Sequence, residues 1–323
     1  MAGGSTTRGD GTPRSFAATA LALLRHHGRH LYGCSARAAG VAALGGLLVT
    51  AAGFLIAWPQ FDAFQAGAVR ARIDEDSYAP DGSRVHTLWI VLLGCLPFLV
   101  LLLHLGCAAV QTAASQAHGR FRAVLGVYVL RGPLVWAPLV LGILVEEYFT
   151  TTAFRQHTAI VPKWEYPNLF ELLRYGPPLL GLAVALALRL GWTLAPATCA
   201  AEDLGPWAAM RRSWSLTWGR AAAWYGTAAV ALPLGTLTVG AYLLLHAACR
   251  PLRSATASLF LDRGPENPYG AYAAGALAPI AAALLLTGAL TLPLAHTAFA
   301  VLQQRLAQAR ARDRDLTAAA LRG

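Results

Sequence analysis

The chain is poor in charged residues. Asp, Glu, Lys and Arg make up only 13% of its 323 residues, and 56% of the residues are hydrophobic, whereas a soluble domain carries about 25% charged residues. A soluble fold of this size cannot bury that much apolar side chain, but a lipid bilayer can accept it directly. The composition therefore excludes an ordinary soluble protein and indicates a membrane protein.

Cysteine and lysine are also scarce. The five cysteines are scattered and include no CxxC pair, so neither a disulfide framework nor a zinc site is expected. Lys163 is the only lysine, and arginine therefore carries almost all of the net charge of +10. Together with the many alanines and glycines, this composition is typical of a bacterium with a high-GC genome.

Sequence signatures of catalytic sites are missing. The chain has no Walker loop, no HExxH and no GxSxG beside a hydrophobic run. His104, His246 and His296 lie in three different hydrophobic runs, and His246 falls toward the opposite side from the other two. We therefore expect no catalytic residue, no metal site, no cofactor and no nucleic acid partner.

Six hydrophobic runs are long enough to cross a bilayer, which takes about 20 apolar residues in a helix. The predicted fold class is an all-α integral membrane protein with about six transmembrane helices and short cytoplasmic amphipathic surface helices. The predicted spans cover about 38–58, 87–110, 126–147, 177–196, 221–249 and 272–302.

The basic residues set the expected orientation, because Lys and Arg concentrate in cytoplasmic loops. With the N-terminus inside, the inside segments hold 15 of these residues and the outside loops hold nine. The first outside loop also carries five Asp and Glu residues. We therefore predict that both termini are cytoplasmic and that the outside segments, roughly 59–86, 148–175 and 250–270, are short loops.

The two ends of the chain flank the membrane domain 38–302. Residues 1–37 form a cytoplasmic N-terminal segment, in which 15–32 is predicted to be an amphipathic helix on the membrane surface. A basic cluster follows its apolar run, where a cleavable signal peptide has small residues, so an uncleaved first span is expected. Residues 303–323 form a basic cytoplasmic tail.

The segment 194–220 has the most distinctive pattern in the chain. It is predicted to contain the end of a span, a break, a surface helix and a return to the membrane. Asp203 is the predicted N-cap of the surface helix, and Pro206 suits its first turn. Glu202 and Asp203 would then lie at the positive end of the helix dipole.

The predicted surface helix has one apolar face. Its large side chains recur at spacings of three and four residues: Trp207, Met210, Trp214 and Trp218. Arg211 and Arg212 are predicted to face lipid phosphate from the same helix, with Arg220 at the return to the membrane.

The segment resembles the membrane domain found in front of bacterial glycerophosphoryl diester phosphodiesterases and in a wide group of uncharacterised membrane proteins related to it. The family pattern is a span ending in Ala-Pro, then Glu, then Gly-Pro-x-x-Ala-x-x-Arg-Ser-x-x-Leu-x-x-Gly. The matching residues here are Ala195, Pro196, Glu202, Gly205, Pro206, Ala209, Arg212, Ser213, Leu216 and Gly219. The resemblance implies a fold of about six spans, but no activity, because the chain has no room for the catalytic barrel.

Charged residues within the predicted spans are candidates for function, because a charge at membrane depth is costly. If 119–130 is a surface helix, Arg131 lies at the cytoplasmic interface and binds lipid phosphate; otherwise it is buried and needs a partner. Arg189 lies near the inner end of its span and can extend to the interface. Glu146 and Glu147 close a span near the outer side, either as a cation or proton site or as a solvated helix end.

Three functions remain open at this point. The favoured one is a non-enzymatic, lipid-contacting scaffold or accessory protein of the bacterial plasma membrane, with anionic phospholipid as its partner at the cytoplasmic face. The second is a transporter or permease subunit, which the prolines within the spans and the Glu146 and Glu147 pair favour. The third is a lipid-modifying enzyme, which needs polar side chains that converge near one interface.

Overall fold

The chain is helical throughout the part that the structure describes, and no strand occurs in that part. Six helical stretches are long and apolar enough to cross a membrane, and each of the six predicted spans overlaps one of them. The computed structural model describes residues 15–73, 82–149, 167–219, 221–263 and 267–320.

The described residues form ten helical elements. They are α1 (Phe16–Ile73), α2 (Gly82–Ala114), the 3₁₀ turn η1 (His118–Arg120), α3 (Phe121–Tyr148), α5 (Pro167–Gly191), α6 (Ala195–Ala201), α7 (Pro206–Trp218), α8 (Ala221–Ala248), α9 (Pro251–Arg263) and α10 (Pro268–Ala320).

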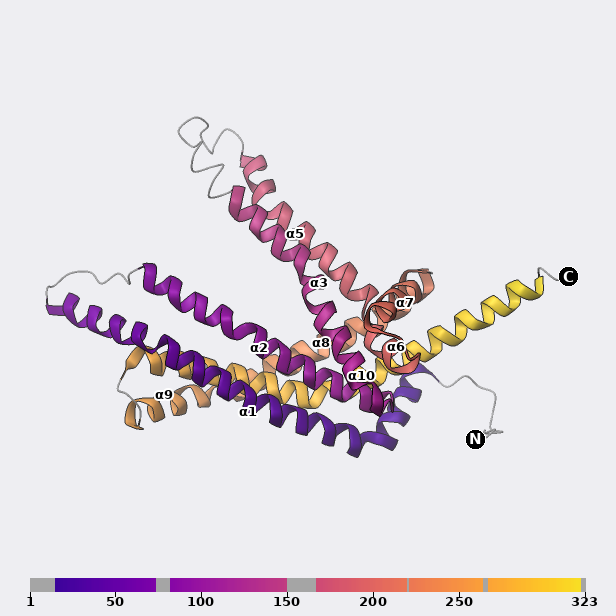
Figure 1. Cartoon of the computed structure of the whole chain (residues 1–323), viewed down its shortest axis with the longest axis horizontal. Coiled ribbons are helices and arrows are strands. Elements are labelled where there is room, and N and C mark those ends of the chain that lie inside the picture. Colours follow the sequence, from indigo (N-terminus) through magenta and orange to yellow (C-terminus); the bar gives the residue numbers. More distant parts are fainter. Residues whose placement is uncertain (1–14, 74–81, 150–166, 220, 264–266, 321–323) are drawn as a thin grey trace.

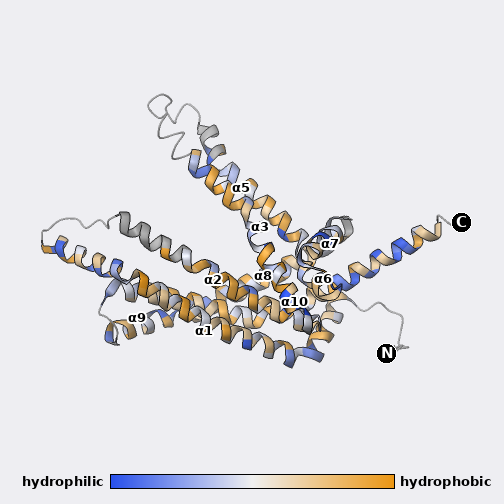
Figure 2. Cartoon of the chain, viewed as in Figure 1, coloured by the Kyte–Doolittle hydropathy of each residue, from blue (hydrophilic) through white to orange (hydrophobic). Residues whose placement is uncertain are grey.

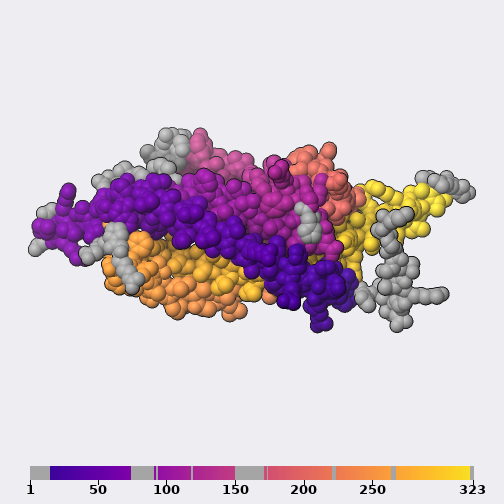
Figure 3. Space-filling view, turned by 60° about the horizontal axis from the view of Figure 1, so that its bottom comes forward, coloured from indigo at the N-terminus to yellow at the C-terminus, as the bar shows by residue number. Residues whose placement is uncertain are grey.

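The helices form two groups that meet at one end of the molecule (Figure 1). In the first group α1 packs against α2 and α10, and α9 packs along α10. The space-filling view in Figure 3 shows α1 running along this group beside α9 and α10. In the second group α3 and α5 pair with each other and lean away from α1 and α2. The short helices α6 and α7 lie where the groups meet, and we call this region the α7 end.

Apolar side chains remain exposed along the middle of the long helices, while polar residues gather toward the helix ends (Figure 2). Large exposed apolar residues occur on every long helix, including Leu55, Leu141, Leu180, Leu244 and Leu284. Soluble monomers rarely expose apolar surface of this extent, so these helices require apolar surroundings.

Buried side chains concentrate at two places. Near the α7 end, helices α2, α3, α6 and α7 share a cluster that includes Ala108, Val124, Val127, Tyr128, Cys199, Ala209 and Met210. Toward the opposite end, α1 contributes Ala57, Phe61 and Phe64 to a second cluster, against which Tyr269 and Ala273 of α10 pack. The first cluster joins α2 to α3, α6 and α7, and the second joins α1 to α10.

Helices α3 and α5 are in direct backbone contact. A Cβ atom at Gly142 of α3 would lie 2.4 Å from the carbonyl oxygen of Pro177, and one at Gly181 of α5 would lie 2.4 Å from that of Pro138. No larger residue fits at either position, as is usual where membrane helices cross closely. This contact fixes the positions of the side chains that α3 and α5 carry toward the α7 end.

The first helix differs from the sequence prediction. The expected surface helix 15–32 and the first span belong to one continuous helix, α1, which also extends through Pro59 into the predicted loop 59–86. No proline occurs between residues 16 and 58. Each glycine there lowers helix stability by only about 1 kcal/mol relative to alanine, so the glycines do not end the helix. The start of α1 does bend away from the long remainder of the helix (Figure 1).

Three further boundaries differ from those considered in the sequence analysis. The segment 119–130 is not a separate surface helix, because after η1 its residues form the buried start of α3. The predicted loop 250–270 contains the helix α9. The last span and the basic tail form the single helix α10, whose final turns extend beyond the α7 end (Figure 1).

Candidate lipid-contacting site at the α7 end

The break between α6 and α7 positions the candidate site. Gly205, not Asp203, occupies the N-cap position of α7, because Pro206 at the first helical position places the cap one residue before it. The prediction for Asp203 was therefore wrong. Asp203 has a positive φ of 54°, a conformation that Asp tolerates better than most residues. Its carboxylate forms an ion pair with Arg120.

One face of α7 is packed against the rest of the protein. Ala209, Ser213 and Leu216 are buried on this face, and the Ser213 hydroxyl donates a hydrogen bond to the carbonyl of Gly191 over 2.8 Å. Met210 is buried beside them in the cluster at the α7 end, so it does not belong to the exposed apolar face predicted from the sequence. Ala209, Ser213 and Leu216, three residues on which the predicted resemblance rests, are therefore packing residues.

The prolines and glycines of the same pattern shape the backbone. Pro206 sits against α3, because a Cβ atom at Gly126 would lie 2.8 Å from its Cγ atom. Pro196 is buried in the first turn of α6, and the Gly219 amide at the end of α7 donates to the Ser215 carbonyl. Arg220 lies outside the described residues.

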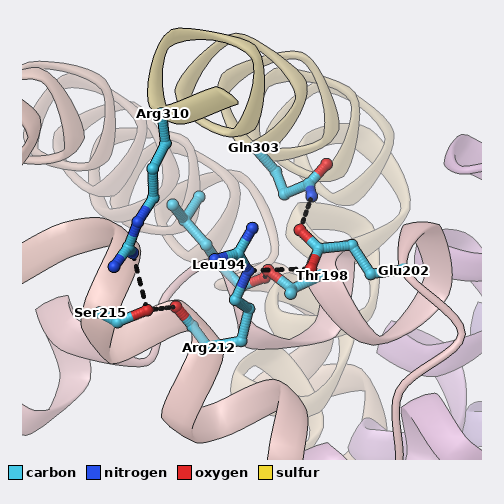
Figure 4. Close-up of polar contacts among 7 residues, drawn as sticks. All are labelled: Leu194, Thr198, Glu202, Arg212, Ser215, Gln303 and Arg310. Carbon is cyan, nitrogen blue, oxygen red and sulfur yellow. Dashed lines mark hydrogen bonds and ion pairs between the residues drawn. The ribbon is translucent and has the colours of Figure 1, made fainter. Parts of the chain in front are cut away.

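Glu202 joins three helices at the α7 end (Figure 4). One carboxylate oxygen accepts a hydrogen bond from Nε of Arg212 on α7 over 2.9 Å, and the other accepts one from the Gln303 amide on α10 over 3.0 Å. The Arg212 and Glu202 side chains are 25% and 26% exposed. Arg212, which was predicted to face lipid phosphate, is thus paired within the protein.

A second contact ties α10 to α7 (Figure 4). The Arg310 guanidinium donates to the Ser215 hydroxyl over 2.9 Å, and that hydroxyl donates to the Arg212 carbonyl over 2.8 Å. Arg310 therefore ties α10 to α7, while the final turns of α10 extend beyond this contact.

The opposite face of α7 is partly exposed, although the Trp214 and Trp218 rings pack against Gly191 of α5. Trp207, Arg211, Trp214 and Trp218 lie on this face, because spacings of four, three and four residues keep side chains on one side of a helix. The three tryptophans are 54%, 39% and 40% exposed, and Arg211 is exposed as well. Trp207, Trp214 and Trp218, which were predicted to share one apolar face, thus lie together, and Arg211 lies among them.

The tryptophans of α7 belong to a longer row of aromatic rings. Trp192, just after α5, lies 6.1 Å from Trp214 between ring centroids, and Trp214 lies 5.6 Å from Trp218. Trp224 at the start of α8 follows at 6.0 Å from Trp218. The sequence analysis missed Trp192 and Trp224, because they belong to other helices and only the fold brings them to α7.

Arg131 and Arg189 lie next to this aromatic row. Arg131 is half-buried in α3, where its guanidinium donates to the Trp192 carbonyl over 3.1 Å and lies 5.2 Å from the centre of the Tyr128 ring. Arg189 of α5 is exposed and lies 5.9 Å from the centre of the Trp136 ring. Arg131 therefore lies within the helix α3, which begins at Phe121, and not after a separate surface helix.

Glu146 and Glu147 are not part of this region. They lie in the last turn of α3, 15 residues beyond Arg131, a separation of about 22 Å along a helix.

A polar chain crosses the helices behind Arg131. Nδ1 of His296 on α10 lies 2.8 Å from Oε1 of Gln111 on α2 and 3.4 Å from the Tyr128 hydroxyl on α3. The ring of His104 stacks near that of Tyr128, with centroids 6.0 Å apart. The sequence analysis singled out both histidines but missed Gln111 and Tyr128.

The exposed surface at the α7 end thus offers aromatic rings and guanidinium groups, which suit an interface between water and lipid. Comparison of the chain with models of protein families, with curated proteins and with solved structures found no match. The resemblance of 194–220 to the phosphodiesterase membrane domain therefore stays a prediction.

Proposed function

We propose that this chain is a non-enzymatic, multi-pass protein of the bacterial plasma membrane. Its α7 end would lie at the cytoplasmic surface and contact anionic phospholipid, as a scaffold or accessory protein does. Both termini would be cytoplasmic. The observation that carries the proposal is the two-sided character of α7: one face is sealed into the protein, and the other presents three tryptophans and Arg211.

Aromatic and basic side chains have a known preference for this location. Tryptophan is enriched at membrane interfaces, because its ring is apolar while its N–H group is polar. A helix with an apolar face and basic residues beside it lies in the plane of the interface, where arginine reaches phosphate. The aromatic row from Trp192 to Trp224 extends this surface over the adjoining ends of α5 and α8.

The tryptophans also provide the assay. The purified chain is reconstituted into bilayers that contain brominated phosphatidylglycerol or brominated phosphatidylcholine, which quench the fluorescence of nearby tryptophan. We expect brominated phosphatidylglycerol to quench preferentially. Arg211→Gln should lower that preference about fivefold, since one basic residue near an anionic surface contributes about 1 kcal/mol.

Arg314→Gln is the matched control. Arg314 is an exposed arginine near the end of α10, so the variant has the same charge change outside the α7 face and should keep the wild-type preference. Equal quenching by the two lipids in the wild type, or an equal loss in both variants, would count against a lipid-contacting role for α7.

Transport is the second candidate function, and the polar chain at His296 favours it. Gln111 donates its amide to Ser115 over 2.9 Å, so its oxygen faces His296, and the proton of the imidazole resides on Nδ1. Nε2 is buried and has no hydrogen-bond partner among the described residues. A polar group of this kind at membrane depth is a candidate site for a proton or substrate.

Proton flux into liposomes that hold a pH-sensitive dye tests this second candidate. The variant His296→Asn keeps an N–H group that can face Gln111 but removes Nε2, and His246→Asn on α8 is the control. A transporter would lose flux in the first variant only. Wild-type flux equal to that of empty liposomes would eliminate proton transport.

A further inference from the structure

Arg131 and Arg189 face the same region from two different helices. The antiparallel pairing of α3 and α5 sets Arg131 against Trp192 and Arg189 against Trp136. The tight contact of Gly142 with Pro177, together with that of Gly181 with Pro138, holds the two helices at this spacing. The distance between the arginines is therefore fixed by the fold rather than by flexible loops.

Neither arginine has a carboxylate partner among the described residues. Arg131 uses one guanidinium nitrogen for the Trp192 carbonyl, although a guanidinium carries five N–H donors. The positive charges of Arg131 and Arg189 act unfavourably on each other. In apolar surroundings an arginine without a counter-charge is costly, so an anionic group bound between α3 and α5 would stabilise both arginines.

The surroundings of the pair suit a lipid headgroup. Trp192 contacts both Arg131 and Trp214, so the two arginines adjoin the aromatic row of the α7 end. Exposed leucines continue from them along α3 and α5, away from the α7 end: Leu134, Leu141, Leu179, Leu180 and Leu186. A phosphate between the arginines would thus place acyl chains along an apolar surface.

We propose that Arg131 and Arg189 together bind one phosphate group, which is carried by the headgroup of an anionic phospholipid lying along α3 and α5. Guanidinium groups match phosphate geometry through paired hydrogen bonds. Basic pockets between membrane helices on the cytoplasmic side are sites of this kind. The proposal deepens the proposed function and rests on it, but the site is separate from the exposed face of α7 and holds a single lipid molecule.

Arg131 also contacts the residue that follows α5, so a substitution there could weaken lipid binding by disturbing the fold. Arg189 is the better test of binding, because it is exposed and its side chain lies over the Trp136 ring. Arg189→Gln should therefore leave the fold intact, and thermal unfolding in detergent checks this. Arg131→Lys keeps the charge but loses the paired geometry of the guanidinium.

The experiment is a titration of the delipidated, full-length chain with phosphatidylglycerol, followed by native mass spectrometry. The wild type should bind a first lipid more tightly than the lipids that follow. Arg189→Gln should weaken this first step about tenfold or more, because it removes charge-assisted hydrogen bonds to phosphate. Arg131→Lys should weaken it as well. Arg314→Gln, with the same charge change near the end of α10 and outside both proposed lipid contacts, should leave the first step unchanged.

The outcomes are distinct. Loss of the first phosphatidylglycerol in Arg189→Gln supports the site with a lipid as the source of phosphate. Unchanged lipid binding, with loss of an inorganic phosphate adduct in the same variant, supports a phosphate site with a soluble source. No change in either overturns the proposal. The proposed function fails separately, if Arg211→Gln leaves the preference for brominated phosphatidylglycerol unaltered.

Discussion

The ion pair between Glu202 and Arg212 offers a quantitative test of how the α7 end is assembled. Glu202→Ala removes two hydrogen bonds at once, one from Arg212 and one from Gln303. It also leaves the Arg212 charge without its partner in a place where three quarters of the side chain is covered. Docking of α7 against α6 and α10 should weaken as a result.

The magnitude follows from the partial exposure of the pair. Hydrogen bonds to charged groups contribute about 1.5–3 kcal/mol when buried, whereas fully exposed ion pairs contribute about 0–1 kcal/mol. With both side chains about one quarter exposed, we expect Glu202→Ala to lower the free energy of unfolding by about 2 kcal/mol. A double-mutant cycle with Arg212→Ala should give an interaction energy of about 1 kcal/mol.

The assay is reversible unfolding in mixed detergent micelles, with tryptophan fluorescence as the signal. Asp203→Asn is the matched control, since it neutralises the adjacent carboxylate, whose side chain is 84% exposed, and Asn tolerates the positive φ at that position. Its cost should stay below about 1 kcal/mol. An interaction energy below about 0.3 kcal/mol for Glu202 and Arg212 would refute the reasoning.

Two further predictions concern packing away from α7. Gly142→Ala should lower the free energy of unfolding by about 1–3 kcal/mol, because its Cβ atom would overlap the Pro177 carbonyl; Gly240→Ala, which meets no atom within 4 Å, should be neutral or stabilising, and equal effects in detergent unfolding would contradict the close helix contact. Asn267 caps α10 through the amides of Tyr269 and Gly270 and donates to Asp62 over 2.9 Å. Asn267→Ala should therefore cost about 1–2 kcal/mol, and Asn267→Ser, which keeps a capping oxygen, should cost less.

The long apolar helices were the part of the fold that the sequence predicted well. A run of about 20 apolar residues has few alternatives to a helix, so hydropathy located all six stretches. Hydropathy reports where an apolar run ends, but a helix can continue past that point, as α1 does through Pro59. The continuity of α1 and of α10 into the neighbouring polar segments was missed for that reason.

The candidate site could be predicted only in part. The spacing of Trp207, Trp214 and Trp218 was sufficient to identify an apolar face. Arg211 and Arg212, however, were both predicted to face lipid phosphate. Adjacent residues on a helix differ by about 100°, so only Arg211 shares the face, while Arg212 lies beside Ala209 and Ser213. Applying the periodicity to each arginine separately would have made this distinction.

Contacts between distant segments had no signal in the sequence. Gln111 and His296 are separated by 185 positions, and Glu202 and Gln303 by 101. No local pattern joins such residues, because the pairing depends on how the helices pack. The same holds for Arg131 and Arg189, which were each recognised as charges within spans but not as neighbours.

The depth of α7 relative to a bilayer tests the central claim most directly. A spin label is attached at Trp207→Cys, in a chain without its five native cysteines, and the variant is reconstituted into bilayer nanodiscs. Power saturation with oxygen and with a water-soluble nickel chelate measures the depth of the label. Labels at Leu243 on the exposed face of α8 and at Arg314 near the end of α10 serve as deep and aqueous references. We expect a depth at the headgroup boundary, between the two references. A label at position 207 that is as accessible to the nickel chelate as the one at 314 would contradict the account.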